Sequence, residues 1–541
     1  MKFIFTTFIL YTFLFGKNFA LDVENYAAYI EELSYDAKFL DEYTKWSSEL
    51  FSQSDYIYGN SHGKFPCPID KSNENISIPT SVHTLRPSDV KCIAAMGDSL
   101  TTGIAAHAIT PIGLLMENRG ISWSIGGDYT YSKMLSLPNI LRQYNPKLEG
   151  YSTKVSLMFP NSQNGTNNGL NVAKSWDSSS QMVYQAELLI NRLKHDKLCD
   201  WDKDWKVITL FVGSNDLCSF CEDSNSTKHT PEQYMHNIRD TLNKLYNASI
   251  PRTLINLVPV LNVRNVKDLR NGNYICQILY KKTCPCAAFP TAEQAKTLED
   301  YIIRYHQLLF DFIGSRRYED RDDFTVVIQP FMVKTKLPYK NNHKIDFSYF
   351  APDCFHFSGK GHSLAALSLW NNMLEPVGGK KSSWHIGESL KCPTKEYPYI
   401  FTWKNSAKAL DEFKHTTIVQ TTNSISTISS DTSIYDVNST SQYHRKHKKT
   451  KFDISSNKMK FITVTGFLFI IAMILIIGIV RRRKVRVFIP GNERHDFNGI
   501  DNSQYHDDND EVEVWSRTNT KSNYFKNNET IKQHGTRISF E

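Results

Sequence analysis

The sequence predicts an α/β fold in which a central parallel β-sheet is covered by helices on both faces. Strand-like and helix-like segments alternate from about residue 90 to residue 392 of the 541-residue chain. The strand-like segments are short runs of β-branched and apolar residues, as is typical of strands buried on both faces. This alternation predicts strands joined by helical crossovers, and an apolar content of 40% provides for a core.

Each element has a local signal. Strands are expected at residues 91–96, 205–212, 253–260 and 324–329. A helix is expected after Thr230, because an N-cap, a proline at the first helical position and a capping-box glutamine precede an apolar stripe. Thr291 and Gln294 give a second helix the same start, and Gly314 is expected to stop it. Residues 26–40, in a polar and aromatic N-terminal segment, are expected to form one further helix.

The N-terminus has the pattern of a signal peptide, predicted over residues 1–20. Lys2 precedes an apolar run over residues 3–15, and Ala20 is a suitable last residue, although Asn18 fits the cleavage pattern poorly. The alternative is an uncleaved signal anchor. The apolar run is short for a membrane span, which favours cleavage.

A second apolar run, at residues 461–480, is long enough to form a transmembrane helix, because 20 helical residues cover about 30 Å. Basic residues flank it on both sides, so charge alone does not orient it. The predicted signal peptide sets the orientation. It places residues 21–460 outside the cell and residues 481–541 in the cytoplasm. The prediction is a single-pass type I protein of the plasma membrane, with an N-terminal extension at 21–85, a main domain at 86–400 and a Ser/Thr-rich stalk with a basic juxtamembrane segment at 401–460.

Cysteines and glycosylation sequons support export. All ten cysteines lie between Cys67 and Cys392, and disulfides are favoured over a zinc site because exported thiols become oxidised. No metal or other cofactor is expected. Glycosylation sequons begin at Asn75, Asn164, Asn225, Asn247 and Asn438.

Three short motifs follow the predicted strands or lie near the end of the domain. Ser99 stands in a Gly-Asp-Ser turn directly after the first strand, where open parallel sheets bind ligands. Asp353 and His356 are spaced so that the carboxylate can orient an imidazole that takes the serine proton. Asn215 follows the second strand and can direct its amide at a developing oxyanion. Each motif alone is more often an ordinary turn or a packed residue; together and in this order they indicate a serine hydrolase.

With these motifs the chain resembles the GDSL, or SGNH, hydrolase superfamily. Longer matches resemble the membrane-associated phospholipase B family and span about residues 85–392; they are SWSIGGD (122–128), LPNILRQYNP (137–146), ITLFVGSNDLCSFC (208–221) and APDCFHFSGKGHSLAALSLWNNMLEPVG (351–378). The resemblance implies a three-layer α/β/α sandwich in a GDSL-type hydrolase domain at 86–400. It also implies metal-free hydrolysis of acyl esters in phospholipids and lysophospholipids.

By the same resemblance, Ser99 is the nucleophile, His356 the base and Asp353 its partner, while the Ser99 N–H and the Asn215 amide bind the oxyanion. The family places a glycine after its second block as a third oxyanion donor, and this chain has Trp176 there. We expect that a tryptophan does not easily take a glycine-only conformation and that it crowds the pocket. Loss of that donor would slow the reaction by about 10²–10³, unless a shifted loop supplies another N–H.

Two alternatives follow from this departure and from the breadth of the superfamily. One is a catalytically weak or inactive surface receptor or adhesion protein on a hydrolase fold. The other is an esterase of acetylated sugars or other small acyl esters.

The net charge of +7 lies largely in the flanks of the apolar C-terminal run, so no nucleic-acid partner is expected. The expected partners are lipid substrates and the bilayer, and the sequence defines no oligomeric state.

Overall fold

The computed structural model describes residues 21–59, 63–69, 77–158, 165–223, 225–271 and 273–411. The predicted signal peptide, transmembrane helix and cytoplasmic tail lie outside these residues, as do Asn75, Asn164 and Asn438. The described part of the chain contains no helix that is both long and apolar enough to cross a bilayer.

A four-stranded parallel sheet forms the centre of the fold, in the order β1-β4-β5-β6. Its strands are β1 (Val90–Gly97), β4 (Trp205–Phe211), β5 (Thr253–Val258) and β6 (Phe324–Ile328). All four lie where the apolar runs predicted strands, so the predicted parallel sheet is confirmed. Irregular segments pair with the free edge of β1, through parallel bridges from Cys92 to Glu149 and from Ala95 to Asn171.

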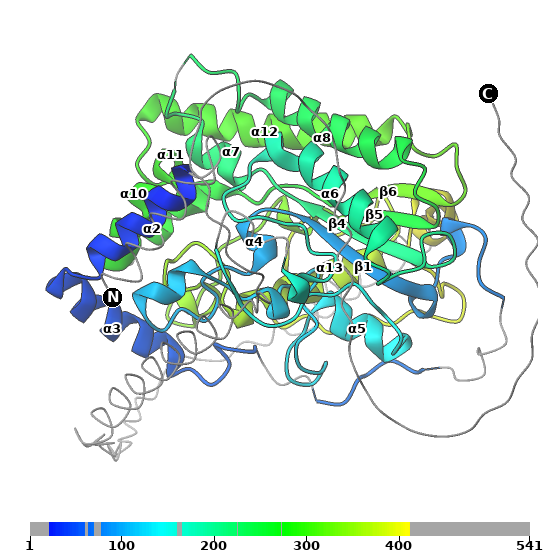
Figure 1. Ribbon diagram of the computed structural model, residues 1–541, viewed down its shortest axis with the longest axis horizontal. Helices are drawn as coiled ribbons and strands as arrows, with labels where there is room; N and C mark the ends of the chain where they lie inside the picture. The colour runs from blue at the N-terminus through cyan, green and yellow to red at the C-terminus, as the bar shows by residue number, and fades with distance from the viewer. Residues whose placement is uncertain are drawn as a thin grey trace, which may run out of the picture. The chain divides into compact units, whose positions relative to one another are not determined.

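Helices cover both faces of the sheet (Figure 1). The long helices α6 (Met182–His195), α8 (Pro231–Asn247) and α12 (Ala292–Gly314) pack side by side on one face. Helices α5 (Leu137–Tyr144) and α13 (Gly359–Met373) pack together on the other. The shorter elements are α4 (Ser99–Thr102), α7 (Ser214–Ser219), α9 (Val266–Arg270), α10 (Tyr274–Thr283), α11 (Pro285–Ala288), β2 (Met116–Glu117) and β3 (Ser156–Leu157).

The predicted helix starts are present. The Thr230 side chain accepts a hydrogen bond from the Gln233 backbone N–H at the start of α8. Thr291 and Gln294 form a complete capping box at the start of α12, each side chain accepting from the other residue's backbone. These caps satisfy N–H groups that a helix leaves unpaired in its first turn.

The N-terminal segment forms two helices, so the prediction of one helix over residues 26–40 is wrong. Helix α2 (Leu21–Leu33) ends before Asp36, whose side chain caps α3 (Ala37–Phe51) by accepting from the Phe39 N–H. Both helices lie against the domain at the end where α7, α10 and α11 meet (Figure 1). The Tyr43 hydroxyl donates to the Ala108 carbonyl, and the Trp46 indole donates to the Pro352 carbonyl.

The folded domain also extends past residue 400. Ile400 and Phe401 are buried, and their backbone N–H groups donate to the carbonyls of Leu85 and Met373. Ala409 is buried as well. Residues 401–411, expected to begin the stalk, therefore pack onto the domain, because apolar side chains follow Tyr399 before the Ser/Thr-rich composition starts.

All ten cysteines form disulfides, which confirms the prediction of disulfides over a zinc site. The pairs are Cys67–Cys392, Cys92–Cys199, Cys218–Cys284, Cys221–Cys286 and Cys276–Cys354. Two of the predicted glycosylation sites, Asn225 and Asn247, are described and exposed, and their modification stays a prediction.

Candidate active site

Ser99 directly follows the turn at the carboxyl end of β1, the strand at one edge of the central sheet. Gly97 ends the strand at φ +149°, and a Cβ there would lie 2.2 Å from the Phe211 carbonyl oxygen, so only glycine fits. Asp98 caps the short helix α4 by accepting from the Leu100 N–H. The turn leaves Ser99 as the first residue of α4, and the residue is only 6% exposed.

The structure brings Ser99, His356 and Asp353 into one chain of hydrogen bonds. The Ser99 hydroxyl lies 2.8 Å from His356 Nε2, and His356 Nδ1 lies 2.6 Å from Asp353 Oδ2. The other carboxylate oxygen of Asp353 accepts from the backbone N–H groups of Phe355 and His356, each at 3.0 Å. The imidazole is thus oriented by a carboxylate on one side and contacts the hydroxyl on the other, as nucleophilic catalysis by serine requires.

The carboxylate of Asp353 stays ionised in spite of its burial. Burial by itself raises the pKa of this group, but the His356 charge, the His356 side-chain hydrogen bond and the two backbone donors outweigh it, and the pKa is lowered. A negative Asp353 stabilises an imidazolium at His356.

A disulfide and a tyrosine brace the loop between Asp353 and His356. Cys354 has φ +63° and is bonded to Cys276 on α10. The Tyr280 hydroxyl, also on α10, donates to the Cys354 carbonyl at 2.6 Å. The loop therefore has two attachments to a helix that is remote in sequence.

Trp176 does take the left-handed conformation, so the expectation that it would avoid a glycine's backbone geometry is wrong. Its φ is +73°, which costs about 1 kcal/mol for a residue with a side chain. Contacts of the indole compensate: its N–H donates to Met158 Sδ at 3.1 Å, and its ring lies 5.0 Å from that of Tyr26 on α2. The ring is thus directed toward α2 and Met158.

The three N–H groups that the sequence offers as oxyanion donors differ in their hydrogen bonds. Among the described residues, neither the Ser99 nor the Trp176 backbone N–H has an acceptor. Asn215, at the start of α7, donates one amide hydrogen to the Asp177 carbonyl at 2.8 Å, which fixes the amide and leaves its second hydrogen. Asp177 directly follows Trp176, so this bond also ties the Asn215 loop to the Trp176 loop.

Gln185, which no motif indicated, joins the serine turn to the Trp176 loop. Its side-chain oxygen accepts from the Gly97 N–H at 2.8 Å, and its amide donates to the Gly97 carbonyl at 2.9 Å and to Asp177 Oδ2 at 2.7 Å. A glutamine on the buried face of α6, beside Met182, Ala186 and Leu189, was the available signal, because a buried amide requires partners.

A buried ion pair supports the Trp176 loop from the other side. Glu117 and Arg119 are paired at 2.8 Å and are almost completely buried. Glu117 accepts from the Ser175 hydroxyl at 2.7 Å, and Arg119 donates to the Ala173 carbonyl at 3.0 Å. The residues flanking Trp176 are therefore held by charged partners, which accounts for a strained backbone that persists.

Two further buried carboxyl groups have raised pKa values. Burial, together with the charges of Asp216 and Asp177, raises the pKa of Asp98 to about 8 in spite of its backbone hydrogen bonds. Burial raises the pKa of Asp177 to about 6, against the opposing hydrogen bond from Gln185. Asp216 binds the backbone N–H and hydroxyl of Ser179 at 2.8 and 2.7 Å. It thus positions a neighbouring loop, and none of its hydrogen bonds in the described part of the chain goes to Ser99.

Two cavities of different chemistry flank the site. One, of about 300 Å³, has Trp176 and Asn215 in its wall together with polar and basic side chains of α2, α7 and α10. The other is a narrow apolar cavity of about 40 Å³ at the carboxyl ends of β5 and β6, lined in part by Leu100, Phe355 and Phe357. Leu100 and Phe355 are the chain neighbours of Ser99 and His356.

The fold and the site together define a serine ester hydrolase, a class in which a hydroxyl activated by an imidazole attacks an acyl carbon. Residues 93–369 match the family model described as GDSL-like Lipase/Acylhydrolase. The chain belongs to this family.

Three of the similar proteins share one name. The chain is 39% identical over 341 residues to "Phospholipase B1, membrane-associated" of Homo sapiens, and the match covers 62% of this chain and 22% of that protein. The proteins of the same name from Rattus norvegicus and Mus musculus are 36% and 38% identical, over 67% and 61% of this chain and 25% and 22% of theirs. The chain thus spans about a quarter or less of the length of these relatives. An extracellular lipase from Streptomyces rimosus aligns over 52% of this chain and 99% of its own, at 12% identity and a TM-score of 0.26, too low to add to the family assignment.

Proposed function

We propose that the protein is a membrane-anchored ectoenzyme that hydrolyses acyl esters of phospholipids and lysophospholipids through a Ser–His–Asp acyl-enzyme mechanism. The observation that carries the proposal is the continuous set of contacts from the Ser99 hydroxyl to His356 at 2.8 Å and from His356 to Asp353 at 2.6 Å. The names of the relatives, which are membrane-associated phospholipases, support the lipid substrate and the membrane location.

In the first half-reaction, Ser99 Oγ attacks the acyl carbonyl carbon while His356 Nε2 takes the hydroxyl proton. The carbonyl π electrons move to the oxygen, and the resulting oxyanion accepts hydrogen bonds from the N–H groups of Ser99 and Trp176 and from the Asn215 amide. Collapse of this intermediate breaks the ester C–O bond, and His356 returns the proton to the departing alcohol. Asp353 holds the imidazole and stabilises its charged form throughout.

In the second half-reaction, water attacks the acyl-enzyme with His356 again taking a proton. The acid leaves, and the proton returns to Ser99 Oγ. Every proton thus passes through His356, so the hydroxyl–imidazole contact is required in both halves. The cavity of about 40 Å³ beside Leu100 and Phe355 is apolar, which supports a hydrocarbon group next to the ester on that side, with room there for only its first carbons.

The anchoring part of the proposal comes from the sequence. It combines the signal peptide at 1–20 with the stalk, a transmembrane helix at 461–480 and a short cytoplasmic tail, which places the hydrolase domain outside the cell. Protease treatment of intact cells, with antibodies against residues 21–411 and against the tail, tests this orientation: loss of the first epitope and protection of the second support it, and the reverse pattern contradicts it.

The catalytic part is tested with wild type and Ser99→Ala on four substrates: a phospholipid, a lysophospholipid, a triacylglycerol and an acetyl ester. We expect hydrolysis of the two phospholipids by wild type, and no hydrolysis and no fluorophosphonate labelling with the variant. Thr102→Ala, on the same short helix, is the control for local disruption. Retained activity in Ser99→Ala refutes the nucleophile. A folded wild type that stays unlabelled indicates the inactive receptor, and activity on the acetyl ester alone indicates the small-ester esterase.

A further inference from the structure

The larger cavity begins at the residues that are proposed to bind the oxyanion. Trp176 and Asn215 form part of its wall, and the rest comes from the α2, α7, α10 and α11 region, where these helices meet at one end of the molecule (Figure 1). A substrate whose carbonyl oxygen lies between the Ser99, Trp176 and Asn215 donors therefore has this cavity next to its ester group. The volume of about 300 Å³ suits a small polar group and falls at the lower limit of ligand pockets.

The cavity is basic, and its cations are not neutralised. Lys228, Lys281 and Lys282 line it, and none of them has a carboxylate within 4 Å among the described residues. Glu222 is the one carboxylate in the described wall. Lysine ammonium groups bind phosphate as point charges and adapt to its position through a flexible stem.

The remaining wall offers neutral hydrogen-bonding groups. Ser178, Gln181 and Thr283 contribute a hydroxyl, an amide and a second hydroxyl. Ser178 and Gln181 are held by their own capping box, in which the Gln181 side chain accepts from the Ser178 N–H at 2.8 Å. The Lys282 ammonium also lies 5.8 Å from the centre of the Tyr29 ring. A preorganised polar wall with cations that have no carboxylate partner favours an anion that carries several acceptor oxygens.

The apolar cavity borders the same site through other residues than the basic cavity does. It is bordered by Leu100 and Phe355, next to the nucleophile and the base, and almost all of its surface is apolar. An ester bound at Ser99 thus has an apolar region beside Leu100 and Phe355 and a cationic region beside Trp176 and Asn215. A phospholipid has this same order: an acyl chain, an ester and, across the glycerol, a phosphate.

We infer that the basic cavity formed by Lys228, Lys281 and Lys282 binds the headgroup phosphate of the substrate and so selects phospholipid esters over neutral lipid esters. This inference rests on the proposed function and adds to it the groups that distinguish a lysophospholipid from a monoacylglycerol. In the bound state the lysines hold the phosphate, Trp176 and Asn215 hold the carbonyl oxygen, and the glycerol spans the distance between them.

The test compares two substrates with the same medium-length acyl chain, a lysophosphatidylcholine and a monoacylglycerol, each below its micelle concentration. In the full-length chain carrying Lys228→Gln, Lys281→Gln and Lys282→Gln, we expect kcat/KM for the lysophospholipid to fall at least about tenfold, mainly through KM, because weakened ground-state binding changes KM. For the monoacylglycerol we expect a change of less than about twofold, since it has no phosphate to lose.

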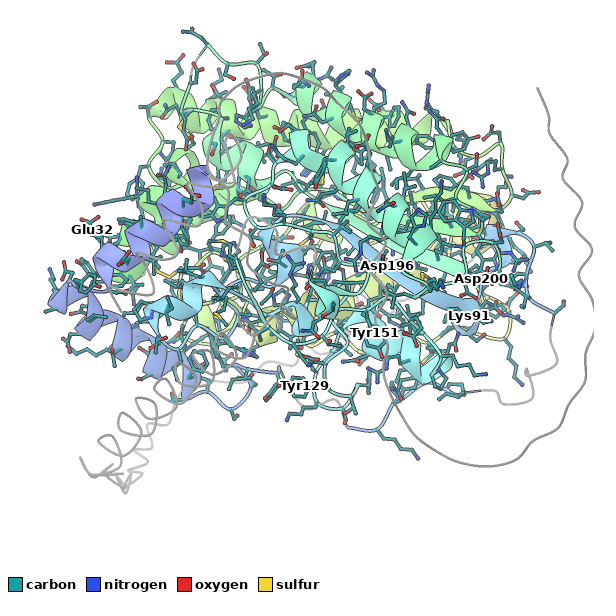
Figure 2. All side chains as sticks on the ribbon, viewed as in Figure 1. Glu32, Lys91, Tyr129, Tyr151, Asp196 and Asp200 are labelled. Atoms are coloured by element: carbon teal, nitrogen blue, oxygen red, sulfur yellow. A yellow bond between two sulfur atoms is a disulfide. The ribbon has the colours of Figure 1, made fainter. Side chains whose placement is uncertain are left out.

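The matched control removes two lysines at the other end of the sheet, Lys147→Gln with Lys194→Gln. Lys147 follows Asn145, whose side chain contacts Val90 at the start of β1, and Lys194 lies in the last turn of α6. Figure 2 shows Lys91, Asp196 and Asp200 at this end, away from Glu32 on α2. The control should leave both substrates unchanged, and fluorophosphonate labelling of every variant confirms an intact site.

Four results overturn the inference. An unchanged kcat/KM for the lysophospholipid, or an equal fall for both substrates, excludes a headgroup site while leaving the proposed function intact. Added inorganic phosphate distinguishes a site for the lipid headgroup from a site for free phosphate. If the cavity binds the headgroup, phosphate should raise KM for the lysophospholipid alone. An equal rise in KM for both substrates indicates a site for free phosphate instead. A wild type that hydrolyses neither lipid refutes the proposed function and this inference with it.

Discussion

Replacing Asp98 by asparagine should remove a large pH dependence from the stability of this protein. Asp98 caps the helix that carries Ser99, and burial raises its pKa from 3.8 to about 8. One carboxylate oxygen accepts from the Leu100 N–H, and the other has no partner among the described residues. Asparagine has the same shape as aspartate and is as good an N-cap, so its side-chain oxygen keeps the hydrogen bond from the Leu100 N–H.

The sign follows from where the proton is bound. Below pH 3.8 the carboxyl is protonated in both the folded and the unfolded chain, so it adds no pH dependence. Between pH 3.8 and about pH 8 only the folded chain keeps the proton, and the free energy of unfolding falls by about 1.4 kcal/mol for each pH unit. From pH 5 to pH 7 the wild type should therefore lose about 3 kcal/mol through this one group.

Urea unfolding with the disulfides intact, at pH 5, 6 and 7, measures the effect. The stability of Asp98→Asn relative to wild type should increase steadily over this range, by about 3 kcal/mol in total. Asp311→Asn, on the exposed surface of α12, controls for loss of a carboxylate as such. If the free energies of unfolding of Asp98→Asn and wild type differ by the same amount at every pH, Asp98 is ionised in the folded protein. That result would refute the reasoning.

Two further predictions concern the site itself. Asn215→Ala removes the amide that the Asp177 carbonyl holds at 2.8 Å. It should lower kcat by about 10²–10³ with little change in KM, because an oxyanion donor acts in the transition state. Steady-state kinetics on a soluble ester would measure this fall, and a fall of less than about tenfold would exclude Asn215 as an oxyanion donor. The Cys276→Ser, Cys354→Ser double variant opens a bridge that spans 78 residues, which should cost about 2–4 kcal/mol of stability and lower kcat by loosening the loop that holds Asp353 and His356. Thermal unfolding and single-turnover kinetics check both effects, and an unchanged kcat would show that Tyr280 and the Asp353 hydrogen bonds hold the loop without the bridge.

Local sequence signals were sufficient to predict the strands and the helix starts. The four strands are apolar runs, and the starts of α8 and α12 are set by Thr230 and Thr291, whose side chains act on the N–H groups of their own first turn. The sequence placed Ser99 and Asn215 each directly after a predicted strand, and the structure makes these strands, β1 and β4, neighbours in the sheet. The motif residues Ser99, Asp353 and His356 could be proposed from the chain alone, although nothing local brings the first to the other two.

The tertiary structure decided what depends on residues remote in sequence. Trp176 keeps a left-handed backbone because Tyr26 and Met158 pack on its ring and Arg119 holds the preceding loop. Gln185 became part of the site because α6 places it against Gly97, and the cysteine pairing followed from which segments lie together. The lysines that form the basic cavity come from separate segments of the chain. A helix cap is specified by a few residues that are neighbours in the sequence. A strained loop, a shared amide or a charged cavity forms only in the packed fold, because the free energy of packing must offset the entropy lost when distant groups are brought together.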